Sequence, residues 1–410
     1  MMKGRVLTLT STFPRWHDDS TTPFVPRLAV NLQKIGWQVD ILAPHAHGAA
    51  KTEIIDGLRV KRFQYLWPSS RQTVCYQGGA MINLRRNKLN YLKLPALLFS
   101  EWLSLCRSLA AGHYDILHSH WILPQGFVGA LAAGVRIPHV ITVHGGDVFG
   151  LRGELYARAR KFALRRAAGI TVNSSVTEQA VRDIVPAAAV IKRIPMGVRV
   201  TAPGKGGKQV DELRRYFKKD GGSLLIFVGR VIGEKGVADL LAALKMLLVD
   251  SVPVTLVVVG EGQDRPEMEA LARELRIADA VHFVGWQSAA RVSDYLAAAD
   301  IFIGPSRTAA NGWREAQGLT FLEAMMAGTP VIASRAGGIV DAVRHEQTGL
   351  LVDERAPRQI CQAVKRLLDD QQLYQRLAVN GRKMAEEDFS EEASALAFDK
   401  LFSQLLSCRK

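Results

Sequence analysis

Short apolar runs alternate with longer stretches of helical period along almost the whole of this 410-residue chain. Apolar runs of about four to seven residues are typical of buried strands, and the stretches between them are typical of amphipathic helices. Strands and helices that alternate form βαβ units, whose strands pair in parallel and whose helices cover the sheet. The pattern therefore predicts an α/β protein built on doubly wound parallel sheets.

A segment rich in glycine, proline and lysine, Thr201–Gln209 (TAPGKGGKQ), interrupts this alternation. It has no apolar period, as expected of a linker, and the alternation restarts after it. We predict one Rossmann-like domain at residues 1–200, a second at 201–388, and a C-terminal helix within 389–410 that packs back toward the first domain. Ligands of such sheets bind beyond the carboxyl ends of the strands, so the two domains are expected to face each other across a cleft.

The predicted strands can be placed from the apolar runs. In the first domain they lie near Arg5–Thr10, Gln38–Ala43, Gly57–Tyr65 (as an inserted strand), Ile116–His118, His139–Val143, Gly169–Val172 and Val190–Ile194. In the second domain they lie near Leu224–Val228, Val254–Val259, Val281–Val284, Ile301–Ile303, Val331–Ala333 and Leu350–Val352. The predicted helices between them include Phe24–Ile35, Tyr156–Ala168, Val237–Leu248, Arg265–Arg276 and Phe321–Ala327.

The net charge of +14 is unevenly divided along the chain. Residues 1–200 hold 26 Lys and Arg against 11 Asp and Glu, whereas residues 201–410 hold 27 against 28. An evenly basic protein that wraps nucleic acid is therefore disfavoured, and the two halves are expected to have different partners, neither of them nucleic acid.

Cysteine usage and hydropathy indicate the compartment. Cys75, Cys106, Cys361 and Cys408 show no metal-binding spacing, as expected of reduced thiols in the cytosol. The apolar run before Pro14 is too short for a signal peptide, and no run approaches 18 apolar residues. We predict a cytoplasmic protein that, if it meets the inner face of the cell membrane, lies on it.

Two glutamates eight positions apart, Glu315 and Glu323, lie in the string REAQGLTFLEAMMAGTPVIAS. A helix that begins near Thr320 would offer backbone N–H groups at its N-terminus, where a phosphate can bind. Glu315 in the preceding loop and Glu323 one turn inside the helix could each accept hydrogen bonds from sugar or ribose hydroxyls. The alternative is that Glu323 only complements the helix dipole and that Glu315 is a solvated charge.

The string GRVIGEKG places Gly229 at the end of a strand, and Arg230 and Lys235 in the loop that opens the next helix. Two cations at the carboxyl end of a strand can neutralise a diphosphate leaving group, so a metal ion is not required. The alternative is an ordinary loop with a solvated lysine. The nearby VVVGEGQD, with Gly260, indicates by itself only a glycine turn between strand and helix.

In order along the chain, these strings resemble the retaining glycosyltransferases of family 4, which have the GT-B fold of two facing Rossmann-like domains. The family's pattern of a glutamate, seven residues and a second glutamate, followed by AGxPVxA, matches Glu315, Glu323 and AGTPVIA. Its GRLxxxKG donor loop matches GRVIGEKG. The strings IPMGV, VGEGQD, HFVGW and TGLLV extend the resemblance over essentially the whole chain.

The resemblance implies that the second domain binds a nucleoside-diphosphate sugar. Arg230 and Lys235 would hold the diphosphate, Glu323 the ribose and Glu315 the hexose hydroxyls. The remaining donor-binding residues would be Gly229, Gly260, Gly318 and Leu319. The reaction would retain the anomeric configuration, with the departing phosphate oxygen taking the acceptor proton. It would use no cofactor and no metal, and the nucleotide-sugar would be a co-substrate.

In the first domain, ITVHGGDVFG places His144 at the carboxyl end of a strand, where ligands bind. The resemblance implies that His144 faces the transferred sugar and takes part in catalysis. Asp147 is predicted to cap the same loop on the acceptor side. In the string DILHSHW, His118 is predicted to be buried and His120 to approach the acceptor.

Two strings depart from the family pattern. Many members carry two glycines after the first strand, whereas this chain reads FPRWHDDSTTPFVPRLA. There Ser20, Thr21 and Thr22 are predicted to cap a helix that starts near Pro23 and to contact phosphate. The usual Glu-Gly-Phe-Gly-Leu reads Glu-Ala-Gln-Gly-Leu here, which leaves the identity of the sugar open. The sequence also leaves open whether the base of the donor is that of UDP, GDP or ADP.

Residues 81–107 (MINLRRNKLNYLKLPALLFSEWLSLCR) combine Arg85, Arg86, Lys88 and Lys93 with leucines and aromatic residues. Such a segment either lies in an anionic bilayer interface or packs its apolar side on the first domain and exposes the basic side. We predict a hexosyltransferase that acts on a glycan or lipid-linked acceptor in the synthesis of cell-surface polysaccharide or glycolipid. The alternative is a sugar-phosphate or disaccharide synthase with a small soluble acceptor.

Overall fold

The computed structural model describes residues 2–17, 19, 23–76, 78–134, 137–150, 153–186, 190–201, 206–218 and 221–408. The chain forms two compact units, one of Met1–Gly197 with Glu391–Lys410 and one of Val198–Ser390. The first boundary, after residue 197, falls three residues before the one expected from the sequence, and the second, after residue 390, falls two residues after the one expected.

The sheet of the first unit has the strand order β3-β4-β2-β1-β5-β6-β7-β8. The pair β3–β4 is antiparallel and the other neighbours are parallel. The strands are β1 (Gly4–Leu9), β2 (Trp37–Pro44), β3 (Thr52–Ile55), β4 (Leu58–Phe63), β5 (Ile116–His120), β6 (His139–Val143), β7 (Gly169–Val172) and β8 (Ile191–Arg193). The strand expected at Gly57–Tyr65 is therefore the second arm of a hairpin.

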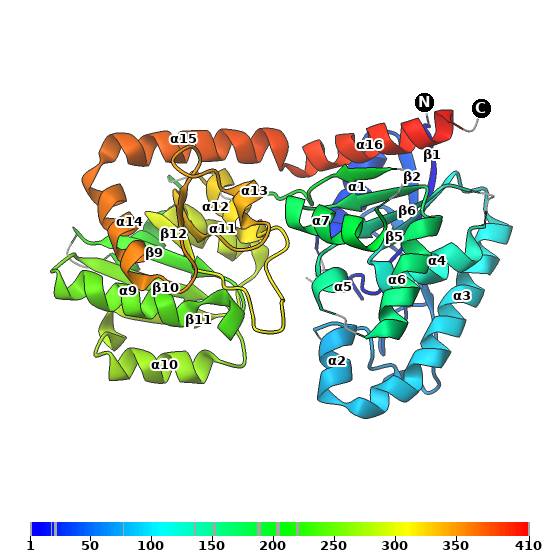
Figure 1. The fold of residues 1–410 in the computed structure, drawn as a ribbon, viewed down its shortest axis with the longest axis horizontal. Helices are drawn as coiled ribbons and strands as arrows, with labels where there is room; N and C mark the ends of the chain where they lie inside the picture. Colours follow the sequence, from blue (N-terminus) through cyan, green and yellow to red (C-terminus); the bar gives the residue numbers. More distant parts are fainter. Residues whose placement is uncertain are drawn as a thin grey trace. The chain divides into compact units, whose positions relative to one another are not determined.

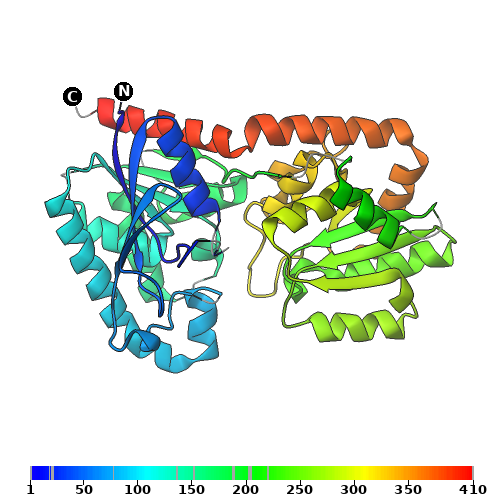
Figure 2. The same cartoon turned by 180° about the vertical axis from the view of Figure 1, so that it is seen from behind.

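The helices of the first unit follow these strands in a doubly wound pattern. They are α1 (Phe24–Lys34), α2 (Ala80–Arg86), α3 (Leu94–Ala111), α4 (Phe127–Ala132), α5 (Gly146–Phe149), α6 (Glu154–Arg166), α7 (Ser175–Ile184) and α16 (Glu391–Ser407), with the short turns η1 (Ser69–Arg71), η2 (Lys88–Lys93) and η3 (Ile122–Gly126). On β5, Leu117 packs in a cluster with α3 and α4, while the ring of His118 lies against Phe398 of α16. Helices thus cover both faces of the sheet (Figures 1 and 2).

The last helix, α16, belongs to the first unit because it is bonded to β2 and α1. The indole Nε1 of Trp37 donates to Asp399 Oδ1 at 2.8 Å, and the ring of Trp37 meets Phe402 edge-on at 5.4 Å. Asn31 of α1 donates to the buried Glu391 at 3.1 Å. The N-terminal half of the chain therefore completes its fold with the final seventeen-residue helix.

The second unit has a parallel sheet in the order β11-β10-β9-β12-β13-β14. Its strands are β9 (Ser223–Val228), β10 (Val254–Val259), β11 (Val281–Gly285), β12 (Ile301–Gly304), β13 (Val331–Ser334) and β14 (Leu350–Val352). Its helices are α8 (Lys208–Phe217), α9 (Val237–Val249), α10 (Arg265–Glu274), α11 (Ala289–Ala298), α12 (Leu319–Met326), α13 (Ile339–Ala342), α14 (Pro357–Asp369) and α15 (Gln371–Asp388), with the turns η5 (Gly233–Lys235) and η6 (Ala278–Ala280).

Two apolar clusters show that helices cover both faces of this sheet. Alternate residues of β9 take part in different clusters, because successive side chains of a strand point to opposite faces. Leu224 and Ile226 pack with α8, α11 and α12, whereas Leu225 and Phe227 pack with α9, α10 and α14. Helix α8 begins at Lys208, so the expected linker is shorter than the glycine-rich string.

Candidate active site

The strand order reverses between β9 and β12 in the second unit, since β10 and β11 continue from one of them and β13 and β14 from the other. Such a reversal separates the two loops that leave the sheet at its carboxyl edge and leaves room for a ligand between them. These loops are residues 229–236, after β9, and residues 305–318, after β12. They contain GRVIGEKG and the first of the two glutamates.

The two loops touch through their backbones at Gly236. This residue has a φ of 70°, and a Cβ added to it would lie 1.9 Å from the carbonyl oxygen of Pro305, so only glycine fits here. Arg307 then donates its backbone N–H to the carbonyl of Glu234 at 2.7 Å, and its guanidinium Nε donates to Asp239 at 2.7 Å. The loops are therefore fixed to each other on both sides of Lys235.

Lys235 and Glu315 meet across this junction, although 80 positions separate them. The ammonium of Lys235 donates to Glu315 Oε2, and the two side chains are 18% and 15% exposed. Trp313 adds its indole ring, whose centroid lies 5.9 Å from the Lys235 Nζ atom. Arg230 differs from Lys235, because it is exposed and has no ion-pair partner among the residues that the structure describes.

The backbone of Glu315 is fixed from a third side. Its carbonyl oxygen accepts the N–H of Gly338 at 2.8 Å, in the turn before α13. A Cβ on the neighbouring Gly337 would lie 2.1 Å from the same oxygen. The carboxylate of Glu315 therefore projects from a loop with little freedom to move.

Helix α12 begins directly after this loop. Gly318 is its N-cap with a φ of 77°, and Leu319 is its first residue. The helix has no side-chain cap and no acidic residue in its first turn, so its N-terminus is suited to an anionic ligand. Glu323 lies one turn inside α12, half-buried.

The glycine turn after β10 packs on the end of β9. A Cβ on Gly260 would lie 2.0 Å from the carbonyl oxygen of Gly229, and a Cβ on Gly262 would lie 2.0 Å from that of Val231. Glycine at these positions lets backbone pack on backbone, so the loop that carries Arg230 and Lys235 rests on a rigid base.

In the first unit the strand order reverses between β1 and β5, and aromatic rings gather at the carboxyl ends of β5 and β6. His120 Nδ1 and His144 Nε2 share a hydrogen bond of 2.9 Å, and their rings are stacked at 5.2 Å. Phe24 and Trp121 pack on His144 at 4.9 and 4.8 Å between centroids. His118 stands beside His120 at 4.4 Å and bonds to Thr142 Oγ1 at 2.6 Å.

Burial keeps these imidazoles neutral. It lowers the pKa of His118 and of His144 to about 3, and it lowers the pKa of His120 well below the usual value for histidine. In a neutral pair one ring donates and the other accepts, so the tautomer of His144 depends on that of His120.

Asp147 lies in α5, one turn beyond His144. Its carboxylate is 3% exposed, and Oδ2 accepts the backbone N–H of Ile122 at 2.9 Å. Burial raises the pKa of Asp147 to about 6, against the opposing effect of backbone N–H groups that include Ile122. In this structure Asp147 joins the loop after β6 to the turn after β5.

The chain is similar to known proteins in sequence and in architecture. The family model for glycosyl transferases group 1 matches residues 209–384, and that for the glycosyl transferase 4-like domain matches residues 21–197. The 2-deoxystreptamine glucosyltransferase of Streptomyces kanamyceticus is 31% identical over 299 residues, which are 69% of this chain and 74% of that protein. This chain belongs to the group 1 glycosyltransferases.

Two further comparisons agree with this assignment. A GDP-mannose-dependent alpha-(1-6)-phosphatidylinositol monomannoside mannosyltransferase of Mycobacterium tuberculosis is 31% identical over 52% of this chain and 56% of its own. The structure of sucrose-phosphate synthase from Thermosynechococcus elongatus superposes with a TM-score of 0.78, with 25% identity over 98% of this chain and all of that one. The glycosyltransferase has the GT-B architecture, with two Rossmann-like domains, as expected from its sequence.

The fold of this glycosyltransferase brings some predicted site residues together. Gly229, Arg230, Lys235, Gly260, Glu315, Gly318, Leu319 and Glu323 all lie at the carboxyl edge of the second sheet. His120, His144 and Asp147 lie at the corresponding edge of the first sheet. Ser20, Thr21 and Thr22 lie outside the described residues.

Sequence reasoning did not find the residues that hold the loop 305–318 of the glycosyltransferase. Besides the Arg307–Asp239 pair, Glu354 accepts the backbone N–H and the hydroxyl of Thr308, each at 2.7 Å. These contacts join residues 46 and 68 positions apart, so no local sequence motif predicts them. Among the residues that the structure describes, no three His, Cys, Asp or Glu side chains are placed to hold a metal ion.

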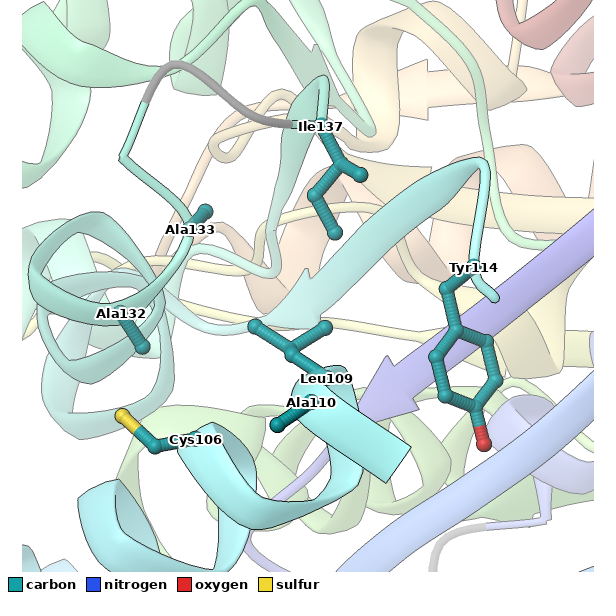
Figure 3. A pocket seen from close by; sticks show the side chains of 7 residues that line it. All are labelled: Cys106, Leu109, Ala110, Tyr114, Ala132, Ala133 and Ile137. Atoms are coloured by element: carbon teal, nitrogen blue, oxygen red, sulfur yellow. The ribbon is translucent and has the colours of Figure 1, made fainter. Parts of the chain in front are cut away.

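A small apolar pocket of about 200 Å³ lies elsewhere in the first unit (Figure 3). It opens beside the amino ends of β5 and β6, away from the histidines, and it is smaller than the usual site for a ligand of drug size. Its lining consists of Cys106, Leu109, Ala110, Tyr114, Ala132, Ala133 and Ile137.

Proposed function

We propose that this glycosyltransferase moves a hexose from a nucleoside-diphosphate sugar to a glycan or lipid-linked acceptor, in the synthesis of cell-surface polysaccharide or glycolipid. The observation that carries the proposal is the junction at the switch point of the second sheet. There Lys235 and Glu315 meet beside the N-terminus of α12, which has no side-chain cap, with the exposed Arg230 on the adjoining loop. Cations suit a diphosphate and a carboxylate suits sugar hydroxyls.

In this proposal, different residues of the second domain bind different parts of the donor. Arg230, Lys235 and the N–H groups of Gly318 and Leu319 hold the diphosphate, while Glu315 orients the hexose and Glu323 the ribose. The bond from the anomeric carbon to the phosphate oxygen breaks, and the acceptor oxygen bonds to the same face of that carbon. The acceptor proton passes to the departing phosphate oxygen, so the product retains the anomeric configuration without a metal ion or an enzymic base.

In the first domain, we propose that His144 binds a hydroxyl of the transferred sugar. Its ring is neutral and can accept or donate one hydrogen bond to a sugar hydroxyl without adding charge. His120 is buried at 1% exposure and is bonded to His144, so it supports His144 rather than contacting the acceptor directly.

The acceptor side carries an exposed stripe that suits an anionic membrane. Leu92, Phe99 and Trp102, at helical spacing in η2 and α3, are 78%, 61% and 37% exposed. Arg85, Arg86 and Lys88 precede them and are also exposed, and Glu101, the one carboxylate within residues 78–112, is buried. Among the described residues no helix is long and apolar enough to cross a membrane. We call residues 85–102 the basic stripe.

A small soluble acceptor remains the second candidate, as in a sugar-phosphate or disaccharide synthase. Two relatives favour it: one is named for 2-deoxystreptamine, and the sucrose-phosphate synthase shares the whole architecture. The mannosyltransferase relative is named for a phosphatidylinositol mannoside and favours the lipid-linked acceptor. We favour the lipid-linked or glycan acceptor because of the basic stripe, since a soluble acceptor gives no reason to expose those aromatic rings.

A screen of donors tests the proposal. Thermal melts with UDP-, GDP- and ADP-sugars should identify one nucleotide that raises the Tm, since a ligand that binds only the folded state stabilises it. Transfer from that donor to lipid-linked and soluble acceptors, with the product anomer read by NMR, then gives acceptor class and stereochemistry. A protein stabilised by none of these donors, or a product of inverted configuration, would contradict the proposal.

A further inference from the structure

The two side chains assigned to different parts of the donor are bonded to each other in the structure. Lys235, assigned to the diphosphate, donates to Glu315, assigned to the hexose. Both side chains are largely buried, so each needs a partner of opposite charge when no donor is bound. A nucleotide that enters the site must therefore compete with Glu315 for Lys235.

The surrounding contacts show that this pair is built into the fold. Arg307 bonds to Glu234 and Asp239 on either side of Lys235, Gly338 holds the carbonyl of Glu315, and the ring of Trp313 lies beside the ammonium. Neither loop can therefore withdraw its charge easily, and the carboxylate stays close to the cation during binding.

We infer that Glu315 makes the site favour the intact nucleotide-sugar over the spent nucleoside diphosphate. This inference rests on the proposed function. With the intact donor, the diphosphate replaces Glu315 as the partner of Lys235, and the hexose hydroxyls replace Lys235 as donors to Glu315. Both buried charges thus stay satisfied.

The spent nucleotide cannot make the same exchange. It brings phosphate to Lys235 but no hydroxyls to Glu315, which is left with water alone. Once its terminal phosphate has given the proton taken from the acceptor to water, it also carries one more negative charge than the intact donor, close to a carboxylate of like charge. Glu315 therefore weakens the binding of the product and favours its release.

Glu315→Gln tests this inference, because glutamine has nearly the same shape and no charge. Binding would be measured by calorimetry with the nucleoside diphosphate that stabilises the wild type most among UDP, GDP and ADP, and with its sugar. The Kd of the diphosphate should fall about tenfold in the variant, as expected for removing one repulsive charge and one competing ion pair. The Kd of the intact donor should rise or stay unchanged, and transfer should slow.

Two controls separate this effect from a general change of charge. Glu261→Gln removes one carboxylate that follows β10 and pairs with Arg265, and should change the diphosphate Kd less than twofold. Glu315→Asp keeps the charge and should not tighten the binding of the diphosphate. Glu315→Ala replaces the glutamine variant if the latter does not fold.

The outcomes distinguish this inference from the proposed function. A diphosphate Kd that is unchanged or higher in a folded Glu315→Gln protein overturns the inference, whereas the donor assignment stands if Lys235→Gln loses the diphosphate. A wild-type protein that binds none of the nucleoside diphosphates or their sugars overturns the proposed function itself.

Discussion

Arg230 is the one cation proposed for the donor site that is both exposed and free of an ion-pair partner within the described ranges. Its removal leaves no buried charge unpaired, so Arg230→Ala should fold as the wild type does. Loss of a contact to the leaving group should slow transfer by about 10² to 10³-fold, with little change in Tm. Steady-state kinetics with the identified donor and a thermal melt would check both parts. Arg273→Ala, an exposed arginine of α10, is the control, and equal rates in the two variants would refute the role of Arg230.

The sequence predicts the roles of some single residues of the site but not the contacts between them. A role for Lys235 and a role for Glu315 could each be predicted from its own local sequence. A cation after a strand indicates an anion site, and a carboxylate before a helix indicates a possible acceptor for sugar hydroxyls. Their ion pair could not be predicted, since it depends on β12 lying next to β9 in the sheet. Arg307 was missed for the same reason: its partner Asp239 lies 68 positions away, and neither residue departs from an ordinary surface pattern.

Within the first unit, Glu101 joins α3 to the turn η3. Its Oε1 accepts from Gln125 at 3.0 Å, its Oε2 has no hydrogen-bond partner among the residues that the structure describes, and the side chain is fully buried. Burial raises the pKa of Glu101 to about 8, against the opposing effect of the Gln125 hydrogen bond. The folded protein therefore keeps this proton to higher pH than the unfolded chain does, and stability is lost as the pH rises from about 4.5 to about 8.

Glu101→Gln should therefore gain stability relative to the wild type as the pH rises. Glutamine keeps the shape and the contact with Gln125 but cannot ionise, so its advantage should be smallest at pH 5 and largest above pH 8. A difference of about 1 to 3 kcal/mol at pH 9 would appear as several degrees in Tm. Melts at pH 5, 7 and 9 would show this, with the exposed Glu392→Gln as a control. A gap that does not change with pH would contradict the prediction.

Whole elements were predicted best where apolar residues form a continuous run. All six strands of the second sheet lie where the sequence places them, because fully buried strands leave a strong signal. The segment 81–107 was predicted less well, since it contains α2, η2 and part of α3 rather than one element. Helix α8 was not predicted, because its few apolar residues follow directly on a glycine-rich string. Its buried Val210, Leu213 and Phe217 show why it forms.

When the charges are counted by structural unit, all of the net positive charge falls in one unit. The first unit holds 28 Lys and Arg against 14 Asp and Glu, and the second holds 25 of each. The whole net charge of +14 therefore belongs to the unit of Met1–Gly197 and Glu391–Lys410, while the unit with the candidate donor site is neutral. In the proposed function, the few cations assigned to the donor site would balance the negative charge of the donor, and the surplus lies on the unit proposed to bind the acceptor.

We expect the protein to bind anionic vesicles through the basic stripe and to bind them little through the rest of its surface. Each cation near a charged bilayer adds about 1 kcal/mol, so Arg85→Glu with Arg86→Glu should weaken partition by about 30-fold or more. Leu92→Ser with Phe99→Ser should weaken vesicle binding without changing its dependence on salt, because these residues contribute buried apolar area rather than charge.

The matched control is Val249→Ser with Val379→Ser, two residues of the neutral unit that are exposed to a similar degree as Leu92 and Phe99. Sedimentation with phosphatidylserine vesicles at low and high salt measures all three. Wild-type protein that stays in the supernatant at low salt would exclude the membrane and favour the soluble acceptor.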